Sequence, residues 1–340
     1  MEYRTLGDCG LKITPLTLGA MTFGSSTGFM KGVTVGSDAE GRRIFDRAID
    51  AGINLVDTAD VYSEGQSETL VGKWLEGKPH EILVATKCRF PMKQGGKLGP
   101  FDQGLSRRYI IDACEASLRR LRVDAIDLYQ VHMQDTSVPI DETVRVLDDL
   151  VHQGKIRYFG CSNYTGYRLV ESLWGADKRN LLRYESVQLQ YSLICRDAER
   201  ELIPAAKAFR LGVLAWSPLG RGFLTGKYKR DQAPGYGTRL ETWKDSWKLM
   251  ATPRNFDILD VVTELASKHE TTPSAVAIAW AMSKPWMTSI IIGARTLTQL
   301  EDNLRALTVK LSAEEITRLD DVSKPAYGYP YDFIAGRQEW

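Results

Sequence analysis

The feature that most constrains the fold of this chain is a regular alternation of short apolar runs with amphipathic stretches of helical length. Alternation of this kind builds right-handed β-α-β units, which place their strands in parallel in one sheet. The eight apolar runs are 16–19, 53–56, 82–85, 126–131, 156–159, 186–189, 212–215 and 289–292. The helical patterns cover 38–51, 66–76, 107–121, 141–153, 166–175, 197–209, 256–283 and 297–306.

Eight such runs, each counted once, predict an α/β fold of the closed (β/α)8 kind, a TIM barrel. An open doubly wound sheet is the alternative. It is disfavoured because no Gly-x-Gly-x-x-Gly sequence follows any of the runs. Ahead of the first run, residues 3–5 and 12–14 flank a Gly-Asp-Cys-Gly turn, so a short N-terminal β-hairpin is expected.

Long connections interrupt the alternation at 24–36, 90–104 and 221–254, and a tail follows Leu311. We expect these long loops at the C-terminal face of the barrel, because long connections in compact domains tend to be lids or binding walls. Candidate walls of a substrate pocket are Met30, Phe90, Trp243, Trp247 and Tyr331. No linker or repeat divides the chain, so residues 1–340 are expected to form a single barrel domain.

The composition excludes several classes of partner. Lysine and arginine total 44 and aspartate and glutamate 43, so the net charge is +1 and no basic excess indicates nucleic acid. The mixed charges of the first residues lead us to expect no signal peptide, and the longest apolar stretch, 275–282, is shorter than the roughly 18 residues that cross a membrane. The five cysteines are scattered without a Cys-x-x-Cys pair, so we expect free thiols, a cytoplasmic location and no metal site.

Polar side chains stand where the apolar runs end, and barrels of this kind carry their active sites at the carboxyl ends of the strands. Asp57, Lys87 and His132 follow three neighbouring runs, and Tyr62 lies five residues beyond Asp57. Each has an ordinary explanation by itself, since turn aspartates, solvated lysines and core histidines are common. Together, an acid, a base and an imidazole at neighbouring strand ends favour one shared active site.

These four residue types suggest acid-base chemistry at a carbonyl group. A phenol has a pKa near 10, and a neighbouring ammonium lowers it, so Lys87 is expected to activate Tyr62 while Asp57 holds Lys87 in place. With His132, these groups form a general acid-base relay toward a developing alkoxide. Without a metal, the set favours carbonyl reduction or its reverse, provided that a hydride donor lies alongside.

The loops after the last two runs suit a cofactor that carries phosphate, since such barrels often bind phosphate there. Arg221 lies among glycines and a hydroxyl, and Arg295 stands at a helix start, where anions are favoured. Trp216, which core packing would explain equally well, is a candidate to stack on a nicotinamide. Candidates to hold its carboxamide are Ser162, Asn163 and Gln188.

Taken together, these motifs resemble the aldo-keto reductase superfamily over essentially the whole chain. The segments that carry the resemblance are 18–24, 54–62 (Asn-Leu-Val-Asp-Thr-Ala-Asp-Val-Tyr), 85–87, 127–132, 160–163, 188–192, 217–222 and 293–303. The resemblance implies a catalytic tetrad of Asp57, Tyr62, Lys87 and His132. The cofactor contacts that it implies are Met21, Thr22, Asp57, Ser162, Asn163, Gln188, Trp216, Ser217, Leu219, Gly220, Arg221, Gly293, Arg295, Gln299 and Asn303.

The resemblance also implies NADP(H) as the cofactor, with NADPH favoured over NADH. Two positions depart from the family's pattern. Trp216 stands where many relatives have tyrosine, and Gln299 where some have arginine, so recognition of a 2′-phosphate would depend on Arg295. The expected activity is reduction of a small-molecule aldehyde or ketone, or the reverse. The alternatives are an NADPH-binding regulatory subunit like the potassium-channel β subunits of the same family, and an unrelated sugar-phosphate isomerase.

Overall fold

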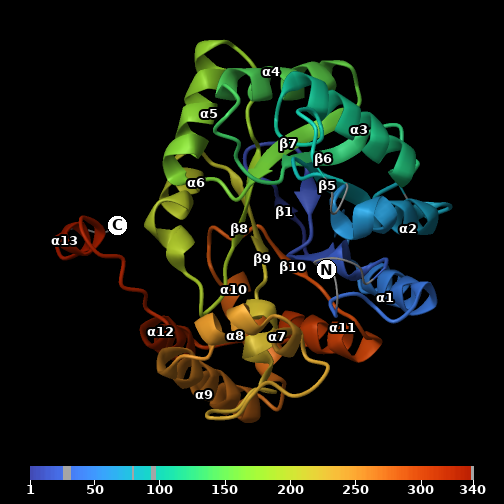
Figure 1. Cartoon of the computed structure of the whole chain (residues 1–340). Helices are drawn as coiled ribbons and strands as arrows, with labels where there is room; N and C mark the ends of the chain where they lie inside the picture. The colour runs from blue at the N-terminus through green and yellow to red at the C-terminus, as the bar shows by residue number, and fades with distance from the viewer. Residues whose placement is uncertain (26–31, 79, 93–96, 338–340) are drawn as a thin grey trace.

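The computed structural model describes residues 1–25, 32–78, 80–92 and 97–337. Its centre is a closed barrel of eight parallel strands, hydrogen-bonded in the order β10-β3-β4-β5-β6-β7-β8-β9, with helices around it (Figure 1). The strands are β3 (Leu16–Gly19), β4 (Leu55–Asp57), β5 (Leu83–Cys88), β6 (Ile126–Val131), β7 (Ile156–Ser162), β8 (Ser186–Gln190), β9 (Gly212–Trp216) and β10 (Ser289–Ile292). The predicted (β/α)8 barrel is therefore confirmed.

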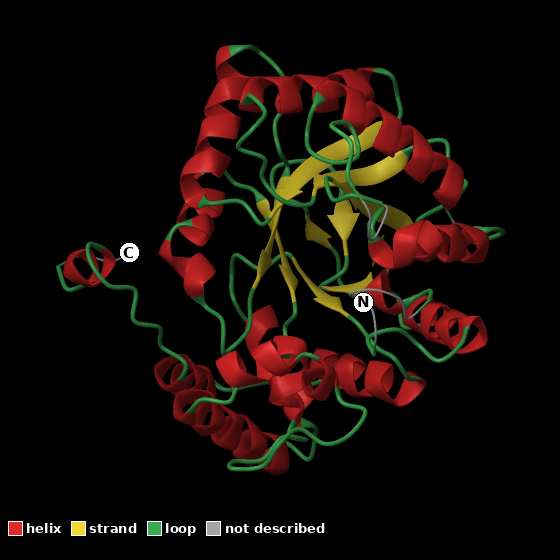
Figure 2. Ribbon diagram, viewed as in Figure 1, coloured by secondary structure: helices red, strands yellow, loops and turns green. Residues whose placement is uncertain are grey.

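The helices that follow the strands pack against the outside of the barrel (Figure 2). They are α1 (Asp38–Asp50), α2 (Gln66–Leu75), α3 (Arg107–Leu121), α4 (Ile140–His152), α5 (Gly166–Lys178), α6 (Leu202–Ala208), α10 (Pro273–Met282) and α11 (Leu297–Leu304). In most of them apolar residues recur every three or four positions, whereas α10 is apolar and buried on all sides. In α4, for example, Val144, Leu147 and Leu150 are all buried and share one face.

The expected N-terminal hairpin is also confirmed, with β1 (Arg4–Thr5) pairing antiparallel to β2 (Lys12–Ile13). Leu6 and Ile13 are fully buried in one cluster with Leu128 and Leu214 of the barrel strands. Between the hairpin strands, Gly7 has φ +60°, and a Cβ there would lie 2.7 Å from the backbone nitrogen of the first residue of β9. The hairpin therefore closes the end of the barrel where the strands begin, and their carboxyl ends are left for the site.

Two predicted helices differ from the structure. Residues 256–283 form two helices, α9 (Pro253–Lys268) and α10, instead of one. Pro273, which lacks a backbone N–H, begins α10, and the side chain of Thr272 caps it by accepting from the N–H of Ala275, so a new helix starts there. Residues 197–209 form a 3-10 turn, Asp197–Arg200, before α6 rather than one continuous helix.

The long connection 221–254 is partly helical. It contains most of the 3-10 segment η5 (Gly220–Thr225), then α7 (Arg239–Thr242) and α8 (Lys244–Met250). The tail holds α12 (Ala313–Val322) and α13 (Tyr331–Ala335), and α13 projects away from the barrel in Figure 1. Within the described residues, every helix is too short or too polar to cross a lipid bilayer.

Candidate active site

A cavity of about 1070 Å³ opens at the carboxyl ends of the barrel strands, large enough for a cofactor together with a small substrate. Most of the predicted site residues line it. They are Met21, Thr22, Asp57, Tyr62, His132, Asn163, Gln188, Trp216, Ser217, Leu219, Arg221, Gly293, Arg295, Gln299 and Asn303. Because parallel strands of a closed barrel end at one rim, residues far apart in the sequence meet here.

Asp57 and Lys87 form a buried ion pair at the ends of β4 and β5. The Lys87 ammonium donates to Asp57 Oδ1 at 2.5 Å and to the carbonyl oxygen of Thr58 at 2.8 Å. Asp57 Oδ2 accepts from the side-chain amides of Gln130 at 3.0 Å and Gln188 at 2.9 Å. Burial lowers the pKa of Lys87, but Asp57 and the nearby phenol raise it by more, so the ammonium stays charged.

Tyr62 follows β4 and begins a 3-10 turn, Tyr62–Gly65. Its hydroxyl lies 3.5 Å from the Lys87 ammonium. Burial raises the pKa of Tyr62, and Lys87 opposes this without overcoming it, so the pKa stands above 10. The expectation that Lys87 brings the pKa of Tyr62 down to a lower value is therefore wrong in its net direction, because desolvation outweighs the charge. At neutral pH the phenol is protonated and has a fixed cation beside its oxygen.

His132 follows β6 and faces Tyr62, with ring centroids 5.7 Å apart and ring planes at 83°. Burial, and then the positive charges of Lys87 and Arg89, hold the pKa of His132 well below 6.5. The imidazole is consequently neutral at pH 7. The backbone carbonyl of His132 accepts from the side-chain amide of Asn163 at 2.9 Å, which ties the end of β6 to the end of β7.

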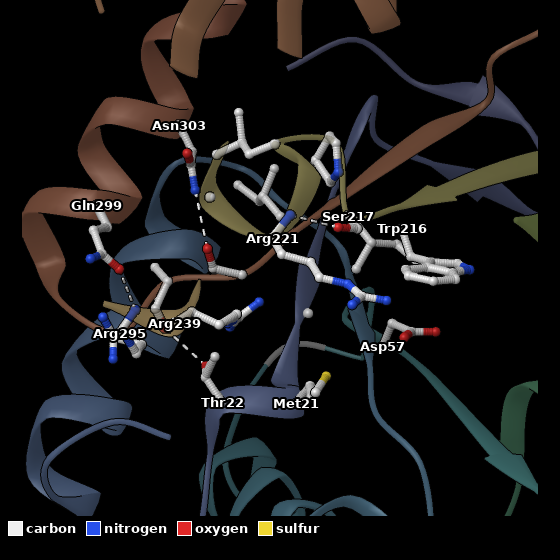
Figure 3. A pocket seen from close by; sticks show the side chains of 18 of the residues that line it. Met21, Thr22, Asp57, Trp216, Ser217, Arg221, Arg239, Arg295, Gln299 and Asn303 are labelled. Carbon is white, nitrogen blue, oxygen red and sulfur yellow. Dashed lines mark hydrogen bonds between the residues drawn. The ribbon is translucent and has the colours of Figure 1, made fainter. Parts of the chain in front are cut away.

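The loop after β9 forms one wall of the cavity (Figure 3). Trp216 ends the strand, and its indole Nε1 is buried without a hydrogen-bond partner among the described residues. Ser217 Oγ accepts from the backbone N–H of Arg221 at 3.0 Å. The Arg221 guanidinium donates to the hydroxyl of Ser246 and lies 5.5 Å from the centre of the Trp243 ring. These contacts attach the loop to α8 and to the residue that joins α7 to α8.

A second wall comes from the loop after β10 and from α11. The side-chain amide of Asn303 donates to the carbonyl of Gly293 at 3.3 Å, and Gln299 Oε1 accepts from the backbone N–H of Arg295 at 2.9 Å. The Arg295 guanidinium also donates to the carbonyl of Gly32 at 2.9 Å. Figure 3 shows Arg295 and Arg239 close together on this side of the cavity.

Sequence reasoning missed two cations of the cavity, Lys227 and Arg239. Burial, followed by repulsion from Arg295, lowers the pKa of Lys227 and lowers that of Arg239 to about 10. In the described part of the chain, neither these two nor Arg295 pairs with a carboxylate. Their only sequence signal was the long connection that holds Lys227 and Arg239. Gln130, within β6, was also missed, although it helps to hold Asp57.

Three predicted residues do not line the cavity. Lys87 lies behind Asp57, fully buried. Ser162 is also fully buried, and its hydroxyl accepts from the side-chain amide of Asn163 at 3.0 Å. Gly220 has φ +53° and packs so closely against Ile194 that a Cβ would lie 2.3 Å from its Cδ1. These residues support the walls instead of forming them.

Among the expected pocket walls, Phe90 and Trp243 line the cavity. The expectation is wrong for Trp247 and Tyr331. Trp247 packs among aromatic side chains behind the loop, and Tyr331 lies on the projecting helix α13. Met30 lies outside the described residues. The described histidine, cysteine, aspartate and glutamate side chains form no group of three suited to a metal ion.

Comparison with known proteins assigns the family. The model of the aldo/keto reductase family matches residues 15–324. The chain belongs to this family. One relative is an uncharacterized oxidoreductase, YrpG, of Bacillus subtilis, which is 38% identical over 95% of this chain and 96% of its own. Family membership supports an oxidoreductase that acts on small-molecule carbonyl compounds with NAD(P)H.

Two further relatives have different names. A putative voltage-gated potassium channel subunit beta of Schizosaccharomyces pombe is 35% identical over 95% of this chain and 93% of its own. Versiconal hemiacetal acetate reductase of Aspergillus parasiticus is 32% identical over 97% of this chain and 99% of its own. The family thus includes members named as reductases and members named as channel subunits.

Proposed function

We propose that this protein, with residues 1–340 as one domain, is an NADP(H)-dependent oxidoreductase that reduces an aldehyde or ketone or catalyses the reverse. The observation that carries the proposal is the Tyr62 phenol, 3.5 Å from the buried Lys87 ammonium and facing His132 in the cavity. A protonated acid beside a fixed cation and a neutral imidazole provides what protonation of a developing alkoxide requires.

We assign a separate task to each of these four side chains. Tyr62 donates the proton to the carbonyl oxygen. Lys87 stabilises the phenolate that remains, because its charge is fixed 3.5 Å from the phenol oxygen. Asp57 holds that ammonium through the bond at 2.5 Å. His132, neutral at pH 7, hydrogen-bonds the reacting oxygen and orients it toward Tyr62.

The cavity fits a nicotinamide dinucleotide. Trp216 presents its indole at a strand end, where a flat ring can stack, and Asn163 and Gln188 line the same cavity with amide groups suited to a carboxamide. Ser217 and Arg221 suit the pyrophosphate, since the loop after β9 contributes both a hydroxyl and a cation to the lining of the cavity. When bound, the reduced cofactor supplies the hydride for reduction.

We further propose that NADPH is preferred over NADH. The support is the group of Lys227, Arg239 and Arg295 in the cavity, which repel one another and of which none forms an ion pair with a carboxylate of the described chain. A 2′-phosphate would relieve this repulsion and form charge-assisted hydrogen bonds with the two guanidinium groups.

A substrate panel tests the proposal. The purified protein is assayed with aromatic and aliphatic aldehydes, ketones, dicarbonyls and sugar aldehydes, with the alcohols in reverse, and with both NADPH and NADH. We expect loss of reduced-nicotinamide absorbance with at least one carbonyl class, and a lower KM for NADPH than for NADH. Tight binding of NADPH with no turnover of any carbonyl or alcohol would contradict the enzymatic proposal.

A second candidate is a cofactor-bound regulatory subunit of a potassium channel. It is favoured by the Schizosaccharomyces pombe relative, which is 35% identical and is named as a putative channel subunit beta. The deciding measurement is affinity purification from cells, set beside the substrate panel. A channel protein that copurifies in stoichiometric amount, with no carbonyl turnover, would favour the subunit, and turnover by the isolated protein would favour the enzyme.

A further inference from the structure

Within the described part of the chain, the imidazole of His132 has no hydrogen bond at Nδ1 of the kind that usually orients a reactive histidine. Such a ring is commonly fixed by a bond from one nitrogen to a carbonyl or carboxylate. In His132, Nδ1 is buried and has no hydrogen-bond partner among the described residues. Among the described residues, the contacts that orient the ring are therefore those of its aromatic neighbours.

Two aromatic rings pack against the imidazole. Phe90 is the closer, with ring centroids 4.9 Å apart and planes at 71°. Tyr62 lies 5.7 Å away with planes at 83°. Both contacts are edge-to-face, the arrangement that aromatic rings prefer. Tyr62 already has a chemical task in the proposed reaction, whereas Phe90 has none.

The backbone around Phe90 is fixed at successive residues. The carbonyl of Phe90 accepts from the hydroxyl of Tyr109 at 2.7 Å, and the carbonyl of Arg89 accepts from the N–H of Gly104 at 2.9 Å. The Arg89 guanidinium lies 5.2 Å from the centre of the Phe90 ring. The ring is therefore held both through its backbone and by a cation that packs on it.

In this arrangement the backbone of Arg89 is strained. Its φ is +143°, in a region that residues with a Cβ rarely adopt. Strain of this kind persists where the surroundings enforce it, and it gathers at functional sites. If the backbone of Arg89 relaxed to a negative φ, the chain would change direction at Phe90, whose ring packs against His132.

We propose that Phe90 is a positioning residue for His132, and that Arg89, in its strained conformation, holds Phe90 against the imidazole. The inference rests on the proposed function, since His132 orients the reacting oxygen there. Phe90 also lines the cavity and can touch substrate directly. The experiment must therefore separate an effect through His132 from an effect on the substrate.

A double-mutant cycle makes this separation. Phe90→Leu is compared with wild type, and the double variant Phe90→Leu/His132→Ala is compared with His132→Ala. Steady-state kcat and KM are measured for all four proteins, and the single-turnover rate constant shows whether chemistry limits kcat. Phe101→Leu is the matched control, since Phe101 also lies under an arginine but is 57% exposed and outside the cavity. We expect Phe90→Leu to lower kcat about threefold to tenfold in the wild-type background and less than twofold without His132.

Equal losses of kcat in both backgrounds would overturn the positioning role and indicate a direct contact with substrate. A ¹⁵N spectrum of the His132 ring adds a second readout, in which Phe90→Leu should broaden or shift the ring signals and Phe101→Leu should not. Unchanged ring signals would also count against the proposal. Absence of turnover in the wild type would instead refute the proposed function, so the two failures are distinguishable.

Arg89→Gly tests the second half of the proposal. Glycine adopts the observed φ without strain, so we expect this variant to unfold at the same or a higher temperature than wild type. At the same time kcat should fall at least threefold, because the guanidinium no longer packs on Phe90. Wild-type kcat in Arg89→Gly would show that Arg89 does not hold the ring.

Discussion

At the scale of single residues, the surroundings of Tyr62 set its protonation. Burial raises the pKa of this phenol, and the Lys87 charge only partly opposes the change. The phenol is therefore protonated in the resting protein, which is the form that a general acid needs. Lys87 remains charged because Asp57 lies 2.5 Å away, so a cation is present where negative charge would develop.

Tyr62→Phe keeps the ring and removes the hydroxyl assigned to protonation. General acid catalysis contributes about 10²- to 10⁴-fold, so kcat should fall by that much, while the Kd for NADPH stays within about twofold. Stopped-flow reduction and cofactor titration measure the two quantities. Tyr236→Phe is the control, because that side chain is 99% exposed. A variant that retains more than about a tenth of wild-type kcat on a chemistry-limited step would rule out Tyr62 as the acid.

At the scale of elements, two loops on different strands create the cationic end of the cavity. Lys227 and Arg239 belong to the connection after β9, and Arg295 belongs to the loop after β10. The strand pair β9–β10 places these loops side by side. Neither loop by itself contains all three cations. The affinity of this end of the cavity for an anion therefore depends on how the two loops pack against each other.

Arg239→Met and Arg295→Met should each weaken NADPH binding more than NADH binding. A charge-assisted hydrogen bond contributes about 1.5–3 kcal/mol, so each Kd for NADPH should rise roughly 10- to 100-fold, and that for NADH less than about threefold. Fluorescence titration with both cofactors measures the ratio. Arg230→Met is the control, since Arg230 pairs with Asp257 and Asp260 outside the cavity. Equal losses for the two cofactors would mean that these arginines do not contact the 2′-phosphate.

At the scale of the whole molecule, the hairpin that stabilises one end of the barrel lies far from the residues of the candidate site at the other end. The N-terminal hairpin places the fully buried Leu6 among residues of the barrel interior, including Leu128 and Leu214. The candidate site lies at the opposite ends of the same strands. Changes in the hairpin should therefore alter the free energy of unfolding without altering the reaction.

Leu6→Ala tests this separation. A large-to-small change in a packed core costs about 2–5 kcal/mol, and Leu6 lies against backbone atoms of β9 that relax little. We expect urea unfolding to show that loss, with kcat at a temperature well below the transition unchanged within twofold. Leu249→Ala is the control, because Leu249 is 77% exposed. A loss below about 0.5 kcal/mol, or a large fall in kcat of folded protein, would contradict the separation.

Much of the fold was predictable because its signals are local. The alternation of apolar runs with amphipathic stretches reports strand and helix periods, and eight such units imply a closed barrel. Asp57, Lys87 and His132 were predictable for the same reason, since each comes at the end of a strand. The junction within 256–283 was missed although its signals, Thr272 and Pro273, are local too, because the apolar pattern continues across them.

The tertiary structure alone decided the features that depend on burial and on distant contacts. Lys227 and Arg239 lie in a connection without periodicity, so only packing shows that they join Arg295. The direction of the Tyr62 pKa depends on desolvation, which exists only once the barrel has closed around the phenol. The sequence by itself thus determined that Asp57, Lys87 and His132 stand where strands end, because strand ends are a local property. The folded chain determined their charge and orientation, because these follow from neighbours that the sequence places far away.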